Sequence, residues 1–238
     1  MTDLDAPQLA QDQTQLADIV NPRCVSKQRS IFKGRVWDLV QEEVSLVDGA
    51  EPFNRDFLRH PGAVAVAAMN EKQQILLINQ YRHPVGASLW EVPAGLLDIA
   101  GEAPLEAAAR ELAEETFLEA RRWDTLMEFY NSPGSSAEAC RIYLARDISA
   151  IPSSKRQERQ QEEAEIVMRW VDIDQAVAAV LAGRIHNAAA TNAILALEAA
   201  LARNFSTLYP ADLPFDAHPL LRDADFRGEI NPSTEAGA

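Results

Sequence analysis

Three glutamates, Glu111, Glu114 and Glu115, lie within five residues of one another. On an α-helix, Glu111 and Glu115 project from one face about one turn apart, with Glu114 at the border of that face. Carboxylates this close repel one another by roughly 0.2–0.5 kcal/mol per exposed pair. A bound divalent cation would relieve the repulsion, and an oxygen-only set without His or Cys suits Mg²⁺, with Mn²⁺ as a possible substitute. A solvated acidic helix face is the alternative that these residues alone leave open.

The helix that carries the three glutamates is predicted to begin at Pro104, because proline suits the first turn, and to run to about Phe117. Arg110 lies four residues before Glu114 and can hold its side chain. The apolar back of the helix consists of Leu105, Ala108, Ala109 and Leu112.

The residues around this helix form a longer pattern. Gly95-Leu-Leu-Asp-Ile-Ala-Gly-Glu102 is followed, after seven residues, by Arg110-Glu-Leu-Ala-Glu-Glu-Thr-Phe-Leu118. This pattern resembles the Nudix box: Gly, five residues, Glu, seven residues, Arg-Glu, an aliphatic, any residue, Glu-Glu, any residue, Gly, an aliphatic. There are two departures. Six residues separate Gly95 from Glu102, and Phe117 stands where the box has its second glycine, which normally permits a left-handed helix cap.

Further motifs narrow the resemblance. Gln80-Tyr-Arg-His83, then Leu89-Trp-Glu-Val-Pro-Ala-Gly95, and later Ser132-Pro-Gly134 with Glu138 are similar to the ADP-ribose pyrophosphatase branch, in a form found in actinobacteria. The resemblance covers roughly residues 34–200. It implies hydrolysis of the pyrophosphate bond of ADP-ribose to AMP and ribose 5-phosphate, with Mg²⁺ as cofactor. The alternatives are a pyrophosphatase for another nucleoside diphosphate sugar or a dinucleotide, and a module that binds ADP-ribose without cleaving it.

The same resemblance implies the fold and assembly. We expect an α/β protein: a Nudix α/β/α sandwich around a mixed sheet, preceded by a small N-terminal antiparallel β domain that is exchanged across a homodimer. The expected divisions are a flexible lead-in at 1–20, the β domain at 21–60, the Nudix domain at 61–205 and a proline-rich tail at 206–238.

The resemblance also implies roles for individual residues. The implied metal ligands are Glu111, Glu114, Glu115, Glu163 and the backbone oxygen of Ala94. Glu163 would act as general base, with Glu114 and Glu115 also in the catalytic set; its neighbour Glu162 could exchange roles with it. The implied substrate-binding residues are Arg82, Glu91, Gly95, Ser132, Gly134 and Glu138, together with Arg55, Asp56 and Trp37 from the β domain of the partner subunit.

Composition excludes other classes of function. The chain has 22 Lys and Arg residues and 36 Asp and Glu residues, which gives a net charge of −14. Binding to a nucleic-acid backbone needs many basic residues, so we expect no nucleic-acid partner. No run of about 18 apolar residues exists, so we expect no membrane span. Cys24 and Cys140 are the only cysteines, which favours a reducing compartment, and we expect a cytoplasmic protein acting on a small nucleotide sugar.

The remaining elements are predicted from hydrophobic periodicity. Apolar runs at 63–69 and 75–81 predict a buried hairpin. Helices are expected at 172–181 and 188–203, with Asp172 and Asn187 as N-caps. A long mobile loop is expected at 148–164, and the tail from Ser206 is expected to pack irregularly or to stay mobile.

Overall fold

The computed structural model describes residues 16–47, 49–156 and 165–222. The described residues divide into two compact units: those of 16–29 and 41–55, and those of 30–40 and 56–222. The predicted domain boundaries at residues 20, 60 and 205 stay predictions.

The strands are β1 (Cys24–Lys33), β2 (Asp38–Ser45), β3 (Phe53–Arg59), β4 (Ala63–Ala68), β5 (Gln74–Arg82), β6 (Ala87–Glu91), β7 (Ala94–Leu96), β8 (Leu118–Tyr130), β9 (Ala139–Ala150), β10 (Val167–Asp172) and β11 (Tyr209–Pro210). The helices are α1 (Pro104–Thr116), α2 (Ile173–Leu181) and α3 (Ala188–Ala202), with short 3-10 helices η1 (His83–Val85) and η2 (Ser153–Lys155).

Three sheets organise these strands. The N-terminal strands form one sheet in the order β1-β2-β3, and the others form β10-β5-β6 and β11-β8-β9-β4-β7. The five-stranded sheet is mixed, because β4 runs parallel to β9 and antiparallel to β7. The α/β fold class is therefore confirmed.

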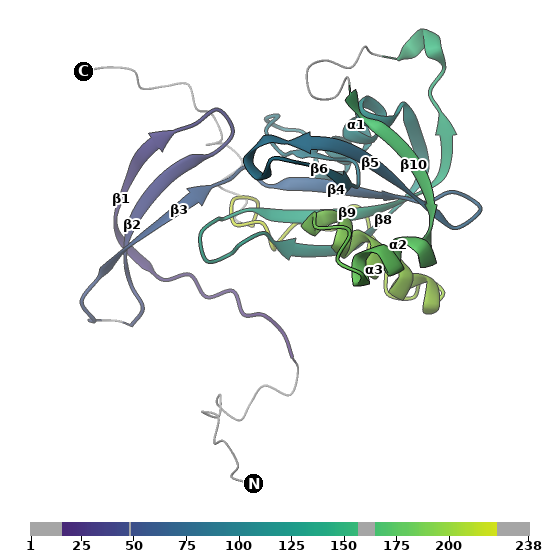
Figure 1. Cartoon of the computed structure of the whole chain (residues 1–238). Coiled ribbons are helices and arrows are strands. Elements are labelled where there is room, and N and C mark those ends of the chain that lie inside the picture. The colour runs from purple at the N-terminus through teal and green to yellow at the C-terminus, as the bar shows by residue number, and fades with distance from the viewer. Residues whose placement is uncertain (1–15, 48, 157–164, 223–238) are drawn as a thin grey trace. The chain divides into compact units, whose positions relative to one another are not determined.

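Strand β4 shows how the core is built on both sides of this sheet. Val64, Val66 and Ala68 pack in one cluster with Ala107, Ala108 and Leu112 of α1. Ala65 and Ala67 pack in a second cluster that includes the buried side chains of α3. A strand buried on both faces reads as a continuous apolar run, which is what 63–68 shows. Figure 1 shows α1 on one side of the sheet, with α2 and α3 on the other.

The predicted hairpin of residues 63–81 is wrong in its pairing. The turn forms, with the Gln73 N–H donating to the Asn70 carbonyl at 3.0 Å, and one antiparallel bridge joins Met69 to Ile75. Beyond that bridge β4 and β5 enter different sheets, because each strand is apolar enough on both faces to be covered separately.

Helix boundaries follow the sequence closely. Pro104 occupies the first turn of α1. Asn187 caps α3, its side chain accepting from the Ala190 N–H at 2.8 Å. Asp172 stands at the N-cap position of α2 without a side-chain capping bond, because its carboxylate accepts from Gln74 Nε2 at 2.8 Å instead.

The loop predicted from residue 148 begins later than expected. Ile148–Ala150 belong to β9 and pair with Leu118–Ala120, so the extended structure runs to Ala150. The tail from Ser206 packs irregularly over its described part, apart from the two residues of β11, which pair with Thr125 and Asp124.

Candidate active site

Helix α1 brings two of the predicted metal ligands against residues 94–95 of β7. Glu115 is 5% exposed, and its Oε2 accepts the Ala94 N–H at 3.0 Å. Glu111, one turn earlier, lies directly against Gly95: a Cβ on Gly95 would stand 2.0 Å from the Glu111 Cδ. A side chain at position 95 would push the Glu111 carboxyl out of this position, so Gly95 permits the close approach of the two groups.

Arg110 links the acidic residues of this face into one network. Its Nε and NH2 donate to the two carboxylate oxygens of Glu102 at 2.8 and 3.0 Å. Its NH1 donates to Glu111 at 2.6 Å and to Glu114 at 3.1 Å. These carboxylates, Glu102 first, raise the pKa of the Arg110 guanidinium above its usual range. The predicted contact with Glu114 is therefore present, and two further contacts were not foreseen.

The donor set of this face fits a hard divalent cation. It offers carboxylate oxygens from Glu111, Glu114 and Glu115 together with backbone at Ala94, and two of the side chains are withdrawn from solvent: Glu115, and Glu111, whose side chain is 12% exposed. Across residues 16–47, 49–156 and 165–222, no three His, Cys, Asp or Glu side chains converge as a complete metal cage. The fourth predicted carboxylate ligand, Glu163, lies outside the described residues. Metal ligation by this set stays a prediction.

Arg82 and Glu91, both predicted to bind substrate, pair with each other on the neighbouring strands β5 and β6. The Arg82 Nε donates to Glu91 Oε1 at 3.0 Å and its NH2 donates to Oε2 at 2.7 Å. Glu91 is 2% exposed, whereas the Arg82 side chain is 38% exposed. A two-point contact with a buried carboxylate fixes the plane of the guanidinium. Glu91 therefore orients Arg82 rather than presenting an open carboxylate of its own.

The residues predicted to line the ribose end form one compact loop between β8 and β9. Ser132 and Gly134 are exposed, and Ser132 has a positive φ of 56°. Glu138 Oε2 accepts from Asn131 Nδ2 at 3.1 Å, which closes the base of the loop. The backbone of Leu58 exchanges hydrogen bonds with Ser135 and Ala137, both at 2.9 Å.

The residues predicted to meet the adenosine from a partner subunit lie on or beside the N-terminal strands. Trp37 is 41% exposed and packs against Phe32, with ring centroids 6.5 Å apart. The Arg55 guanidinium covers the Phe53 ring at 4.7 Å, and Asp56 follows Arg55 on β3. Their role toward a substrate stays a prediction, as does that of Glu162 and Glu163, which lie outside the described residues.

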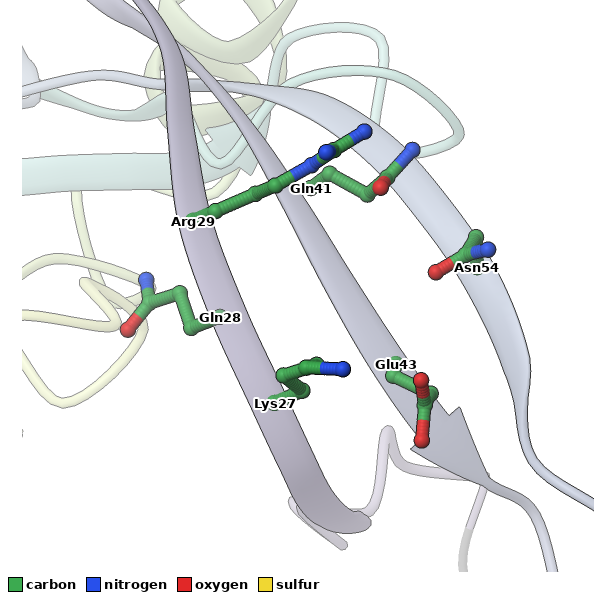
Figure 2. A pocket seen from close by; sticks show the side chains of 6 residues that line it. All are labelled: Lys27, Gln28, Arg29, Gln41, Glu43 and Asn54. Atoms are coloured by element: carbon green, nitrogen blue, oxygen red, sulfur yellow. The ribbon is translucent and has the colours of Figure 1, made fainter.

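A depression of about 290 Å³ lies on the N-terminal sheet. Figure 2 shows side chains from all three strands around it, with cationic, anionic and amide groups mixed. Its lining consists of Lys27, Gln28, Arg29, Gln41, Glu43 and Asn54. Glu43 is already bonded to Ser26 Oγ at 2.8 Å.

Comparison with known proteins shows which family this chain belongs to. Residues 58–191 match the NUDIX domain model, which is more than half of the chain. The chain belongs to the Nudix family. An ADP-ribose pyrophosphatase from Mycobacterium tuberculosis is 38% identical over 190 residues, covering 80% of this chain and 89% of that protein. An ADP-ribose pyrophosphatase from Bacillus subtilis is 35% identical over 168 residues, covering 71% and 88%.

The fold of this Nudix protein also occurs in a solved structure described as an ADP compounds hydrolase. That structure superposes with a TM-score of 0.62, at 16% identity, over 79% of this chain and all of the other. Nudix hydrolases generally need a divalent metal, which agrees with the oxygen donor set on α1.

Sequence reasoning missed a buried arginine that holds the C-terminal segment onto this Nudix domain. Arg141 on β9 is 2% exposed and pairs with Glu128. Its NH1 and NH2 donate to the carbonyls of Leu213 and Pro214, both at 2.7 Å. An arginine inside an apolar run is the one signal that could have indicated a buried cation.

His218 extends the same docked segment to the turn before β4. Its Nε2 donates to the Pro61 carbonyl at 2.6 Å and its Nδ1 accepts the Leu220 N–H at 3.1 Å, so the ring is neutral. Burial is the main reason why the pKa of His218 is lowered, and the neighbouring His60 and Arg222 lower it further. The hydrogen bonds to backbone act in the opposite direction. Burial also lowers the pKa of His60, although Glu138 beside it acts in the opposite direction.

These histidines make stability depend on pH. Because their pKa values are lower in the folded than in the unfolded chain, their contribution is present above the unfolded pKa of about 6.5 and is lost as pH falls below it. The unfolding free energy is measured in urea at several pH values from 7.5 to 5. We expect it to fall less steeply with decreasing pH in His218→Gln than in the wild-type protein. His186→Gln, at an exposed position, is the control. An unchanged slope in His218→Gln contradicts the assignment.

Proposed function

We propose that this Nudix protein hydrolyses the pyrophosphate bond of ADP-ribose, with Mg²⁺, to give AMP and ribose 5-phosphate. The observation that carries the proposal is the convergence of Glu111 and Glu115 on residues 94–95 of β7. Relatives named ADP-ribose pyrophosphatase, which align over most of the chain, support the choice of substrate. All the box carboxylates are present, which weighs against a module that binds without cleaving.

The reaction needs an anionic diphosphate to meet water within an acidic protein. When bound, divalent cations neutralise the diphosphate and activate water. Glu111, Glu114 and Glu115 would supply the oxygens that hold them, and Arg110 fixes the first two of these side chains. Glu163 takes the proton of the attacking water, which is a general-base role.

Residues outside the acidic face are proposed to hold the substrate. Arg82, oriented by Glu91, donates charge-assisted hydrogen bonds to a phosphate or to the terminal ribose. The loop with Ser132, Gly134 and Glu138 lines the ribose end. In this way a few local cations and the bound metal overcome the repulsion between a −14 chain and an anionic ligand.

We further propose that the protein is a cytoplasmic homodimer that assembles through its N-terminal strands, bringing Trp37, Arg55 and Asp56 to the partner's adenosine site. All ten residues of β1 are exposed. The exposed apolar side chains of this region include Val25, Ile31, Phe32, Val36 and Trp37. Both cysteines are free, which suits a reducing compartment. None of the described helices is long and apolar enough to cross a membrane. Light scattering on the purified chain tests the dimer.

Product analysis by mass spectrometry tests the reaction. The wild-type protein is incubated with ADP-ribose, ADP-glucose, GDP-mannose and a dinucleotide, in Mg²⁺ and in EDTA. We expect the highest kcat/KM for ADP-ribose, with AMP and ribose 5-phosphate as the only products, and no turnover in EDTA. A higher kcat/KM for another substrate contradicts the proposed substrate. Tight binding of ADP-ribose without turnover contradicts catalysis and favours a binding module.

A further inference from the structure

Strand β7, which lies against the carboxylates of α1, is positioned by its pairing with β4. In this antiparallel pair Val64 lies opposite Gly95. One step beyond the ends of the two strands, the Leu97 N–H donates to the Gly62 carbonyl at 3.1 Å. A contact that fixes Gly62 therefore also fixes the end of β7, two residues from Gly95.

A buried histidine holds the turn that contains Gly62. The His218 side chain is completely buried, and its Nε2 donates to the Pro61 carbonyl at 2.6 Å. A Cβ on Gly62 would stand 2.0 Å from the same nitrogen, so the imidazole fills the space beside the glycine. Gly62 also has a φ of 92°, a conformation that glycine adopts without strain. The imidazole therefore both bonds to this turn and packs against it.

The C-terminal segment fixes the orientation of the imidazole. Its Nδ1 accepts the Leu220 N–H at 3.1 Å, and the Phe215 ring meets it edge-on, with centroids 5.5 Å apart. The Phe215 ring is covered in turn by the Arg141 guanidinium, whose Cζ lies 4.4 Å from its centroid. Both nitrogens of His218 are thus in use, one toward its own segment and one toward Pro61.

These contacts form a continuous path from the C-terminal segment to the carboxylate helix. It runs from His218 to the turn at residues 61–62 and across the hydrogen bond to Leu97. It ends at Gly95, which lies directly against Glu111. Every step of the path is a hydrogen bond, a packed contact or a step along the backbone.

The end of this path is the oxygen donor set on α1. We propose that His218 is a positioning residue, which holds residues 94–97 in place against Glu111 and Glu115 and so maintains the affinity for a divalent cation. Mg²⁺ demands near-ideal ligand geometry, so a small displacement of the backbone at Ala94 relative to the carboxylates lowers that affinity. This inference rests on the metal site of the proposed function.

Substitutions at position 218 can separate the hydrogen bond from the volume of the side chain. His218→Leu fills most of the space but cannot donate to the Pro61 carbonyl, whereas the amide of His218→Gln can still donate to it. Tyr130→Phe is the matched control, because the Tyr130 hydroxyl docks the same segment at another place, donating to the Ala217 carbonyl at 2.8 Å. If circular dichroism shows that His218→Leu does not fold, His218→Asn replaces it, since asparagine is polar but too short to reach Pro61.

Binding of Mn²⁺ without substrate gives the first readout, measured from the electron paramagnetic resonance signal of the free ion. We expect His218→Leu to raise the Kd of the tightest site about 5-fold, within the ~2- to 30-fold by which residues along such networks change the coupling between sites. His218→Gln and Tyr130→Phe should bind Mn²⁺ as the wild-type protein does. An unchanged Kd in His218→Leu overturns the proposal. An equal rise in either of the other two variants also overturns it, because the bond to Pro61 is then not the cause.

Amide hydrogen exchange tests the path itself and needs neither metal nor activity. We expect faster exchange at the Leu97 amide in His218→Leu, because its acceptor at Gly62 is no longer held. Exchange at Leu97 should stay at the wild-type rate in His218→Gln and in Tyr130→Phe. An unchanged rate in His218→Leu shows that the path does not reach β7, and overturns the positioning role.

Steady-state kinetics with ADP-ribose separate this role from the proposed function. In His218→Leu the half-saturating Mg²⁺ concentration should rise about 5-fold. Its kcat at saturating Mg²⁺ should equal that of the wild-type protein, because all the carboxylates are still present. A loss of kcat that excess Mg²⁺ does not restore overturns the role. If the wild-type protein binds Mn²⁺ in a manner that depends on His218 but does not hydrolyse ADP-ribose, the proposed function fails and the positioning role stands.

Discussion

Glu163→Gln is expected to lower kcat for ADP-ribose hydrolysis at least ~100-fold, the usual scale for removing a general base. Glutamine has the shape of glutamate but cannot accept the proton of the attacking water. KM should change little, because the amide oxygen still accepts hydrogen bonds. The measurement is kcat and KM in saturating Mg²⁺, with the pH–rate profile recorded from pH 5 to 9. Loss of the acidic limb of that profile would identify the missing base.

Two neighbouring glutamates make this experiment selective. Glu162→Gln decides whether Glu162 or Glu163 is the base, since only the variant of the base loses most of its turnover. Glu165→Gln, at an exposed position just after the segment, controls for a general loss of negative charge. Near-wild-type turnover in Glu163→Gln would refute its catalytic role, and a large loss in Glu162→Gln alone would transfer that role to its neighbour.

Glu115→Gln is also expected to lower turnover at least ~100-fold, while the protein stays folded. The bond from the Ala94 N–H, 3.0 Å long, can still be accepted by the amide oxygen, so the packing of α1 on β7 is kept. What is lost is the negative charge that attracts a cation. The half-saturating Mg²⁺ concentration should therefore rise together with the fall in kcat. Circular dichroism and thermal melting verify the fold.

Glu119→Gln provides the matched control for this variant. Glu119 lies four residues further along the chain, is exposed and accepts only at the surface from Ser149 Oγ at 3.2 Å. It should leave both kcat and the Mg²⁺ dependence unchanged. If Glu115→Gln reduces turnover without any change in the Mg²⁺ dependence, Glu115 is not a metal ligand.

Local elements could be predicted from the sequence because their signals are local. Pro104 and the spacing of Leu105, Ala108 and Leu112 define α1, and the structure ends the helix at Thr116. The contact of Arg110 with Glu114 follows from four-residue spacing. The contact of Arg110 with Glu102 cannot be predicted from spacing along the helix, because it depends on how the loop between Gly95 and Pro104 folds back.

Pairings between distant segments could not be predicted in the same way. Strand β4 pairs with β7 and with β9, the latter more than seventy residues later, and nothing in the apolar run at 63–68 distinguishes these partners from the nearby β5. Hydrophobic alternation says which faces are buried but not which strand lies alongside. For the same reason the two-point contact of Glu91 with Arg82 could not be predicted, since it arises only once β5 and β6 pair.

The docking of Arg141 has a practical consequence for anyone shortening this chain. The carbonyls of Leu213 and Pro214 are hydrogen-bond acceptors for a guanidinium that is almost completely withdrawn from water. The proline-rich stretch from Leu213 could be mistaken for a dispensable tail. A truncation before Leu213 would remove two of the acceptors of this guanidinium and leave a buried cation with fewer hydrogen bonds. Crystallisation fragments and C-terminal fusion tags are therefore better placed beyond Arg222.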